Sequence, residues 1–218
     1  MRIQELAEHL NAALGEPLPG ADGQKLLAPR PRKGWEPGII PDDCRHASGL
    51  LLLCPIGDES GLILTVRHGD LPQHAGQVSL PGGAVEEGES IEQGALREAH
   101  EEVGVEPHAV RVLGQLSPLH IPVSRFVLHP VIGITDRRPV LFPQAGEVDR
   151  ILETPLSLLI DRRSYAIERR EFRGTRYEVP YVGVQGERVW GATAMILAEF
   201  LVLLGFPPDP WGPDARPS

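Results

Sequence analysis

Residues 90–104 carry the most complete set of helix signals in this chain. Ser90 followed by Gln93 forms a capping-box pattern, and Gly104 suits the position just past a helix C-terminus. Between these ends an apolar stripe recurs every four residues, at Ile91, Ala95, Ala99 and Val103. Two members of the stripe are alanines, so the helix can approach a sheet closely. The segment therefore predicts an amphipathic helix packed on a β-sheet.

The polar face of this helix concentrates negative charge. Glu98 and Glu102 are one turn apart, and Glu101 lies beside them. Like charges at this spacing destabilise a helix by roughly 0.2–0.5 kcal/mol per pair, and only Arg97 offsets them nearby. Mg²⁺ prefers carboxylate oxygens and would relieve the repulsion. The cluster indicates a divalent-cation site, although a solvated acidic face is the commoner explanation of three glutamates taken alone.

Composition narrows the class of protein. The chain has 218 residues, a net charge of −9, 41% hydrophobic residues and 23% charged residues, which indicates a globular protein without a nucleic-acid-binding surface. Cys44 and Cys54 lack metal-ligand spacing, so we expect reduced thiols and a cytoplasmic protein. The apolar stretch 190–206 contains Glu199 and is short for a membrane span. It predicts a helix over 191–204 that lies in the core or forms a homodimer surface.

Apolar runs and turn residues predict one domain with additional segments at both ends of the chain. We expect a helix over 3–14, an extended arm over 17–43, a single globular domain over 46–205 and a loosely ordered Pro-rich tail over 206–218. The segment 55–61 predicts the loop of a hairpin, and Gly174 predicts the turn of another. Strands are expected over 48–54, 62–67, 110–116, 127–134, 150–153, 163–172 and 175–184. Mixed strands with few helices favour an α/β or α+β sandwich.

The glutamates belong to a longer motif. Its fixed positions are Gly83, Glu89, Arg97, Glu98, Glu101, Glu102 and Gly104. The spacing resembles the Nudix box at every charged and glycine position, and the small Ala99 is the one soft departure. The resemblance implies an α/β/α sandwich with a mixed β-sheet. It also implies hydrolysis of a nucleoside diphosphate linked to another group, with Mg²⁺ or Mn²⁺ as cofactor.

Roles follow from the chemistry together with the resemblance. Diphosphate hydrolysis needs an attacking water and neutralisation of charge on the phosphoryl oxygens. Glu98 and Glu102 are the first candidates for metal ligands. Glu101 is either a third ligand or the carboxylate that orients or deprotonates the water, and the sequence does not choose which glutamate is the base. The resemblance implies that Arg97 steadies the glutamates and pairs with Glu89, where a simple surface ion pair is the alternative.

The preceding segment, 64–83, resembles the stretch before the box in coenzyme A pyrophosphatases of the same family. The matching residues are Leu64, Thr65, Arg67, Leu71, His74, Ala75, Gly76, Gln77, Val78, Pro81, Gly82 and Gly83. Three positions depart, at His68, Pro72 and Leu80, and Pro72 replaces the usual Arg. The resemblance extends over residues 46–205. It implies cleavage of coenzyme A or acyl-coenzyme A to 3′,5′-ADP and 4′-phosphopantetheine.

Substrate contacts are expected in the same segment. Arg67 ends a predicted strand within reach of a phosphate, while His74 and Gln77 lie in the loop before the box. Gly82 and Gly83 are expected to permit a tight turn. Each has an ordinary structural alternative, namely a strand-end charge, a surface loop or a turn.

Two positions outside these motifs are candidates of a weaker kind. Glu147, in a loop flanked by Pro and Gly, is a candidate remote metal ligand or base. Arg30, Arg32 and Lys33 form a small basic patch that is a candidate contact for a remote phosphate, and a solvated loop is the alternative.

Two other functions stay open at this stage. One is a pyrophosphatase for ADP-ribose, NADH or another nucleoside diphosphate derivative. The other is a Nudix-fold module that binds a nucleotide as a regulatory signal without catalysis. The intact Glu98, Glu101 and Glu102 favour an enzyme acting on a small molecule.

Overall fold

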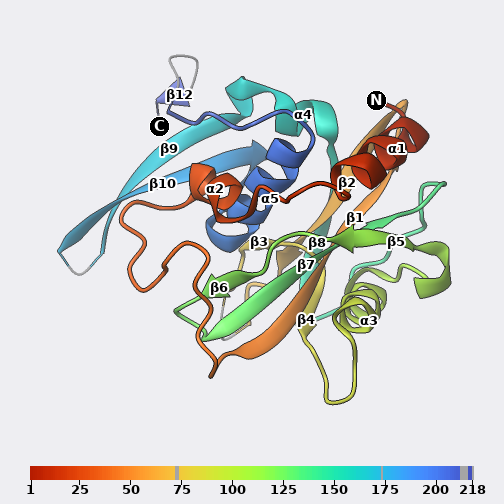
Figure 1. Cartoon of the computed structure of the whole chain (residues 1–218), viewed down its shortest axis with the longest axis horizontal. Helices are drawn as coiled ribbons and strands as arrows, with labels where there is room; N and C mark the ends of the chain where they lie inside the picture. The colour runs from red at the N-terminus through yellow and green to blue at the C-terminus, as the bar shows by residue number, and fades with distance from the viewer. Residues whose placement is uncertain (72–73, 173, 212–215, 218) are drawn as a thin grey trace.

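The computed structural model describes residues 1–71, 74–172, 174–211 and 216–217, and arranges them as a layered α/β fold (Figure 1). Within these residues the larger sheet has eight strands, in the path β3-β2-β1-β7-β5, with β4 on β1, β6 on β7 and β8 on β2. The strands are β1 (Arg45–Ile56), β2 (Glu59–Arg67), β3 (Val78–Ser79), β4 (Gly82–Ala84), β5 (Arg111–Gln115), β6 (Leu119–Ile121), β7 (Phe126–Ile134) and β8 (Val148–Pro155).

The sheet is mixed, as the resemblance implied. β1 and β7 run parallel over nine paired residues, whereas the other neighbours in this sheet are antiparallel. The hairpin of β1 and β2 is confirmed, but its predicted seven-residue loop is wrong: the strands pair as far as Ile56 and Glu59. Gly57, with φ of 60°, permits this tight turn. Residues 55–61 therefore extend the sheet.

Both faces of β1 are covered, which explains its uninterrupted apolar run. Leu50, Leu52 and Cys54 pack against α3 (Ile91–Val103). Leu51 and Leu53 belong to the core on the opposite face, which also contains residues of α1 (Ile3–Ala13) and α5 (Gly191–Leu203). Strands buried on both faces read as continuous hydrophobic runs. Figure 1 shows α3 on the far side of the sheet from α1, which is the predicted α/β/α layering.

A second sheet lies beside the first. Among the described residues it has four strands in the order β11-β10-β9-β12, and their bounds are Glu187–Trp190, Thr175–Val184, Tyr165–Phe172 and Arg216–Pro217 respectively. The β9–β10 hairpin around Gly174 was predicted from the sequence. The short elements α4 (Leu156–Ile160), η2 (Pro107–Ala109) and η3 (Arg162–Ser164) were not.

The helix α5 is core. Its residues 194–201 are all buried, which resolves the alternative left by the sequence and leaves no exposed apolar face on this helix for a homodimer. None of the helices that the structure describes has the length and apolar character needed to span a lipid bilayer. Cys44 and Cys54, both in the described part of the chain, are free thiols as expected. Burial raises the pKa of the Cys54 thiol to about 12.

The predicted extended arm, residues 17–43, is partly wrong. It contains α2 (Gly20–Gln24) and the 3₁₀ helix η1 (Lys25–Leu27), which pack against α5. The buried carboxylate of Glu199 holds this contact together. It accepts hydrogen bonds from the Gly20 N–H at 3.1 Å, the Gln24 amide at 2.8 Å and the Ser117 N–H at 3.0 Å. These buried hydrogen bonds hold the segment in helical structure although its composition is rich in Pro and Gly.

The predicted loose tail is only partly described. Pro208 and Pro210 are buried, Phe206 and Pro207 are exposed, and 216–217 pair with β9 as β12, while 212–215 and 218 lie outside the described residues. The described part of the tail therefore makes contacts that a loose segment lacks, because two of its prolines bury apolar surface.

Candidate active site

The helix α3 forms as its sequence predicts. The Ser90 hydroxyl accepts from the Gln93 N–H at 3.2 Å, and the Gln93 side chain accepts from the Ser90 N–H at 2.8 Å. Gly104 ends the helix with φ of 72°, in the left-handed region that favours glycine. These caps fix where the helix starts and stops, and so fix which of its faces meets the sheet.

Arg97 ties the acidic residues of this helix together. It donates from Nε to Glu89 at 2.9 Å, and from Nη1 to Glu98 at 2.9 Å and Glu101 at 3.0 Å. It also donates to the Ala84 carbonyl at 3.0 Å, which connects the helix to β4. The pairing of Arg97 with Glu89 is therefore present, and it lowers the pKa of the Glu89 carboxyl.

The two expected metal ligands face β4. Glu102 is only 5% exposed, and its carboxylate accepts from the Gly82 N–H at 3.3 Å. Glu98 lies against Gly83, where an added Cβ would stand 2.5 Å from the carboxylate. By contrast the Glu101 side chain is 52% exposed, with its carboxylate bonded to Arg97. The one-face grouping of Glu98 and Glu102 predicted from the helix period is present, with Glu101 beside it.

The expected role of Gly82 and Gly83 as turn formers is wrong. Both residues are in β4, paired with Gly49 and Ser48 of β1, and neither has a positive φ. What the pair supplies is space, because a Cβ on Gly82 would stand 2.3 Å from the Ser48 carbonyl oxygen. Glycine at these positions lets the strand and the carboxylates approach each other.

Burial and like charge shape the electrostatics of this cluster. The pKa of Glu102 is raised to about 7, mainly by desolvation; the Gly82 N–H and Arg67 act to lower it, and the charges of Glu98 and Glu147 act to raise it. Burial likewise raises the pKa of Glu98, and the charges of Glu101 and Glu147 add to this rise. Glu147 therefore stands within electrostatic reach of both carboxylates, although it comes from the loop before β8. Its main-chain carbonyl accepts from the His68 N–H at 2.8 Å.

Arg67 borders the cluster at the end of β2. Its guanidinium lies 3.9 Å from the Glu102 carboxylate, and its buried Nε has no hydrogen-bond partner among the described residues. The loop that follows folds back onto Arg67, whose main chain bonds to Gly76 and Gln77 at 3.0 Å each. His74 and Gln77 contact each other at 3.0 Å. Pro72, the departure from the coenzyme A subgroup, lies outside the described residues.

The donors fit a divalent cation by their chemistry, since all are carboxylate oxygens. Among the described residues, no three His, Cys, Asp or Glu side chains are placed so that they could hold a metal ion as they stand. Arg97 holds oxygens of Glu98 and Glu101 instead. Arg97 bonds to one oxygen of each carboxylate, so the other oxygen of Glu98 and of Glu101 is left for a cation while Arg97 holds both side chains in place.

Ser48 is a buried residue of the site that the sequence did not reveal. Its hydroxyl has no partner among the described residues, and it stands 2.9 Å from where a Cβ on Gly94 of α3 would be. The only sequence signal was a single polar residue at the start of an apolar run. Ser48 and Gly94 together set how closely α3 packs on β1.

Comparison with known proteins places the sequence in one family. The model of the NUDIX domain matches residues 47–155. The uncharacterized Nudix hydrolase NudL of Photorhabdus laumondii subsp. laumondii is 36% identical over 176 residues, covering 80% of this chain and 89% of its own length. The NudL of Pectobacterium atrosepticum is 41% identical over 137 residues, covering 62% and 71%. A crystal structure of the M. smegmatis Nudix hydrolase RenU is 25% identical, with a TM-score of 0.46, over 53% of this chain and 73% of that one.

The fold and the box therefore define a layered α/β protein with a carboxylate-rich site on one helix. The chain belongs to the Nudix family, whose hydrolases act on nucleoside diphosphate derivatives with a divalent cation. Neither NudL name states a substrate, so the coenzyme A assignment stays a prediction.

Proposed function

We propose that this protein hydrolyses the diphosphate bond of coenzyme A or acyl-coenzyme A, giving 3′,5′-ADP and 4′-phosphopantetheine. The observation that carries the proposal is the coenzyme A-type segment 64–83. Its Arg67 lies beside Glu102, and its Gly82 and Gly83 contact the two box carboxylates. Three residues of the segment that resembles the subgroup thus lie beside the carboxylates that would do the chemistry, which supports the proposal.

Glu98, Glu102 and Glu101 would hold Mg²⁺ or Mn²⁺, with Glu147 as a further ligand. A bound cation neutralises charge on diphosphate oxygens and so stabilises the transition state of phosphoryl transfer. This protein needs a cation to neutralise charge, because it carries a net charge of −9 and its substrate is itself anionic.

The chain's own residues divide the remaining work. Arg67 offers donors to a phosphate oxygen, since its Nε is unpaired among the described residues. Glu101 is the most exposed carboxylate of the three and therefore the one that an attacking water reaches most readily. Arg97 and Glu89 hold the orientation of Glu98 and Glu101. His74 and Gln77, which contact each other beside Arg67, contribute polar groups at the rim.

A different nucleoside diphosphate derivative, such as ADP-ribose or NADH, would use the same carboxylates. A non-catalytic regulator would not need them, and the intact Arg97 network argues for an enzyme. We propose the cytoplasm as the place of action because both cysteines are free.

A hydrolysis screen tests the substrate. Purified protein is incubated with Mg²⁺ or Mn²⁺ and with coenzyme A, ADP-ribose, NADH or nucleoside triphosphates, and the products are separated by chromatography. We expect 3′,5′-ADP and 4′-phosphopantetheine to appear with the highest kcat/KM. Efficient ADP-ribose hydrolysis without coenzyme A cleavage would overturn the proposed substrate, and no hydrolysis of any compound would favour the regulator.

Replacing Arg97 by Ala should lower kcat/KM for coenzyme A by about 10- to 100-fold, the usual effect of losing a residue that positions metal ligands. The reason is that Glu89, Glu98 and Glu101 lose their common partner. We also expect a higher Mg²⁺ concentration for half-maximal rate. The measurement is a set of initial rates over a range of Mg²⁺ concentrations.

Arg111→Ala is the matched control, because this arginine is exposed on β5, away from the box. Its rate should stay within about 2-fold of the wild type, as surface substitutions have small effects. Arg97→Lys separates charge from geometry, since lysine cannot reproduce the planar fork. A lysine variant with full activity would contradict the positioning role.

A further inference from the structure

A cavity of about 410 Å³ lies in the N-terminal arm, and none of its described lining residues belongs to the carboxylate cluster. We call it the arm pocket. Its described lining residues are Lys25, Leu26, Ala28, Pro29, Arg30, Pro31, Arg32, Trp35 and Pro37. The volume falls in the range of small-molecule sites, which combine mostly apolar walls with a few well-placed polar groups. This lining has that composition.

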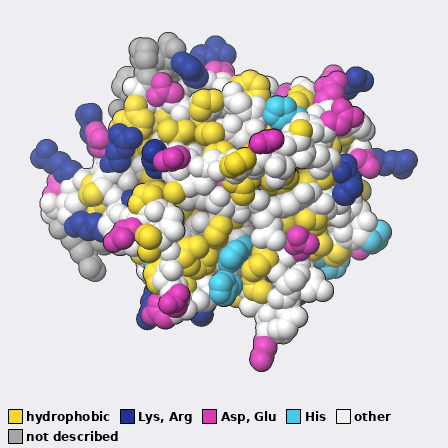
Figure 2. Space-filling view, viewed as in Figure 1, with side chains coloured by type: hydrophobic (Ala, Val, Ile, Leu, Met, Phe, Trp, Pro, Cys, Tyr) yellow, Lys and Arg dark blue, Asp and Glu magenta, His cyan; other side chains and the backbone are white. Residues whose placement is uncertain are grey.

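The charge of the arm pocket opposes that of the protein. Lys25, Arg30 and Arg32 line it, and its described lining contains no Asp or Glu, although the chain as a whole carries −9. Lys25 is paired with Asp22, which is not a lining residue, so Arg30 and Arg32 are the cations left for a ligand. Figure 2 shows Lys and Arg side chains on the side of the molecule where the arm and the β9–β10 hairpin lie, interspersed with acidic ones. Clustered cations within low-dielectric walls attract an anionic ligand.

Arg32 is the least satisfied of these cations. Its Nε is buried and has no hydrogen-bond partner in the described part of the chain. Burial lowers the pKa of its guanidinium to about 10, which still leaves it charged at neutral pH. Buried charges in folded proteins are normally paired, because an unpaired one is costly. A guanidinium fork matches the oxygens of a phosphate group.

Aromatic rings accompany the arginines. The guanidinium of Arg32 lies 5.5 Å from the centre of the Trp35 ring, and that of Arg30 lies 4.0 Å from the centre of the Trp211 ring. Such stacking holds each guanidinium plane in place through cation–π attraction. Trp35 is also a lining residue, so the pocket presents a flat apolar surface beside its cations.

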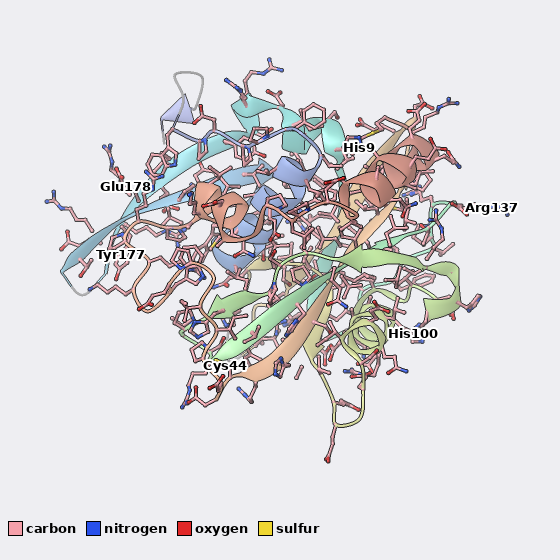
Figure 3. The ribbon with its side chains drawn as sticks, in the orientation of Figure 1. His9, Cys44, His100, Arg137, Tyr177 and Glu178 are labelled. Atoms are coloured by element: carbon pink, nitrogen blue, oxygen red, sulfur yellow. The ribbon has the colours of Figure 1, made fainter. Side chains whose placement is uncertain are left out.

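The backbone under the pocket is anchored. The Arg30 N–H and carbonyl each hydrogen-bond to Glu178 of β10 at 2.8 Å, and Figure 3 labels Glu178 and Tyr177 on that strand. Leu27 and Ala28 are buried in the core. Lys33 reaches the Thr175 hydroxyl at 3.1 Å. A site held this way needs little ordering when a ligand binds, which favours affinity.

We propose that the arm pocket binds a phosphate monoester carried on a nucleoside, with Arg32 and Arg30 contacting the phosphate and Trp35 contacting the base. This chemistry has two sources. One is the 3′-phosphate of the substrate's own adenosine, which rests on the proposed function. The other is a separate nucleotide that binds as an effector. In both cases Arg32, whose Nε has no hydrogen-bond partner among the described residues, is the anion-binding group.

Calorimetry tests the site without catalysis. Wild-type protein is titrated with 3′,5′-ADP, 5′-AMP and adenosine in EDTA, so that no cation bridges a phosphate to the carboxylates. We expect 3′,5′-ADP to bind more tightly than adenosine, and Arg32→Gln to weaken its binding by about 10- to 100-fold, the effect of losing a charge-assisted hydrogen bond. Arg137→Gln is the matched control, because this arginine is exposed far from the arm (Figure 3), and it should leave the Kd unchanged.

Kinetics then separates the two sources. If the anion is the substrate's 3′-phosphate, Arg32→Gln lowers kcat/KM for coenzyme A by about 10- to 100-fold. The kcat/KM of the same variant for 3′-dephospho-coenzyme A stays unchanged. If the anion belongs to an effector, the ratio of kcat/KM for the two substrates stays constant. Because 3′,5′-ADP is also the expected product, the wild type then shows an effect of added 3′,5′-ADP on its rate beyond the product inhibition that it shares with the variant.

Two results overturn the inference. One is equal binding of 3′,5′-ADP and adenosine by the wild type, which needs no variant. The other is an unchanged Kd in an Arg32→Gln protein whose thermal melting matches the wild type. Absence of coenzyme A cleavage would instead overturn the proposed function and leave the calorimetric result standing.

Discussion

Replacing Glu102 by Gln is expected to lower kcat/KM for coenzyme A by more than about 100-fold, beyond the usual effect of losing a residue that only supports the ligands. The substitution removes the charge that a divalent cation needs, and the fold should persist. Gln has nearly the same shape and can still accept from the Gly82 N–H, which bonds Glu102 at 3.3 Å. Initial rates over a range of Mg²⁺ concentrations, together with thermal melting, measure the two effects separately.

Glu92→Gln is the matched control for this prediction. Glu92 is on the same helix, is exposed and lies in the first turn, away from β4. Its substitution should change the rate by less than about 2-fold, as expected for a surface position. Near wild-type turnover of both Glu102→Gln and Glu98→Gln at limiting Mg²⁺ would remove these residues from the metal site.

The long elements of the fold could be predicted because their signals are local. The capping box at Ser90, the Gly104 terminator and the alternating hairpin segments depend on residues a few positions apart. Their physical causes are hydrogen bonds and side-chain spacing within the element itself. The same holds for the apolar run of β1, whose two covered faces leave no polar position in its centre.

The short elements could not be predicted, because pairing with distant residues creates them. β3 and β4 have two and three residues, too few for a periodic pattern. Gly82 and Gly83 are in a strand only because β1 is there to pair with them. Similarly α2, in a Pro- and Gly-rich segment, depends on hydrogen bonds to Glu199, far away in sequence.

The candidate site shows the same division. The spacing on one helix predicted that Glu98 and Glu102 share a face. The pairing of Arg97 with Glu89 came from resemblance to the Nudix box. The contact of Arg67 with Glu102 and the electrostatic reach of Glu147 arise from sheet pairing, so no local pattern contains them. The burial of Glu102 is likewise a tertiary property, since the helix period alone makes it as exposed as Glu101.

Replacing Glu199 by Ala is expected to lower the free energy of unfolding by about 3–5 kcal/mol. This carboxylate is fully buried and accepts three hydrogen bonds, from the Gly20 N–H, the Gln24 amide and the Ser117 N–H. Alanine would leave the Gly20 and Ser117 N–H groups without this acceptor, leave the Gln24 amide with only the Ser117 carbonyl, and add a cavity between α5 and α2. At about 2–4 °C per kcal/mol for a chain of this size, the melting temperature should fall by roughly 6–20 °C.

Glu199→Gln distinguishes the hydrogen bonds from the volume. The amide oxygen of the glutamine can still accept a hydrogen bond, but its amide nitrogen faces other donors. We therefore expect the free energy of unfolding to fall by about 1–3 kcal/mol. Glu8→Ala, at an exposed position of α1, is the control and should cost less than about 0.5 kcal/mol. Denaturant unfolding gives all three values. A fall below 1 kcal/mol in the free energy of unfolding for Glu199→Ala would mean that water replaces the carboxylate, and that α2 is held by apolar contacts alone.

The arm pocket begins at Lys25, directly after Gln24. A large fall in the free energy of unfolding for Glu199→Ala should therefore be accompanied by weaker 3′,5′-ADP binding.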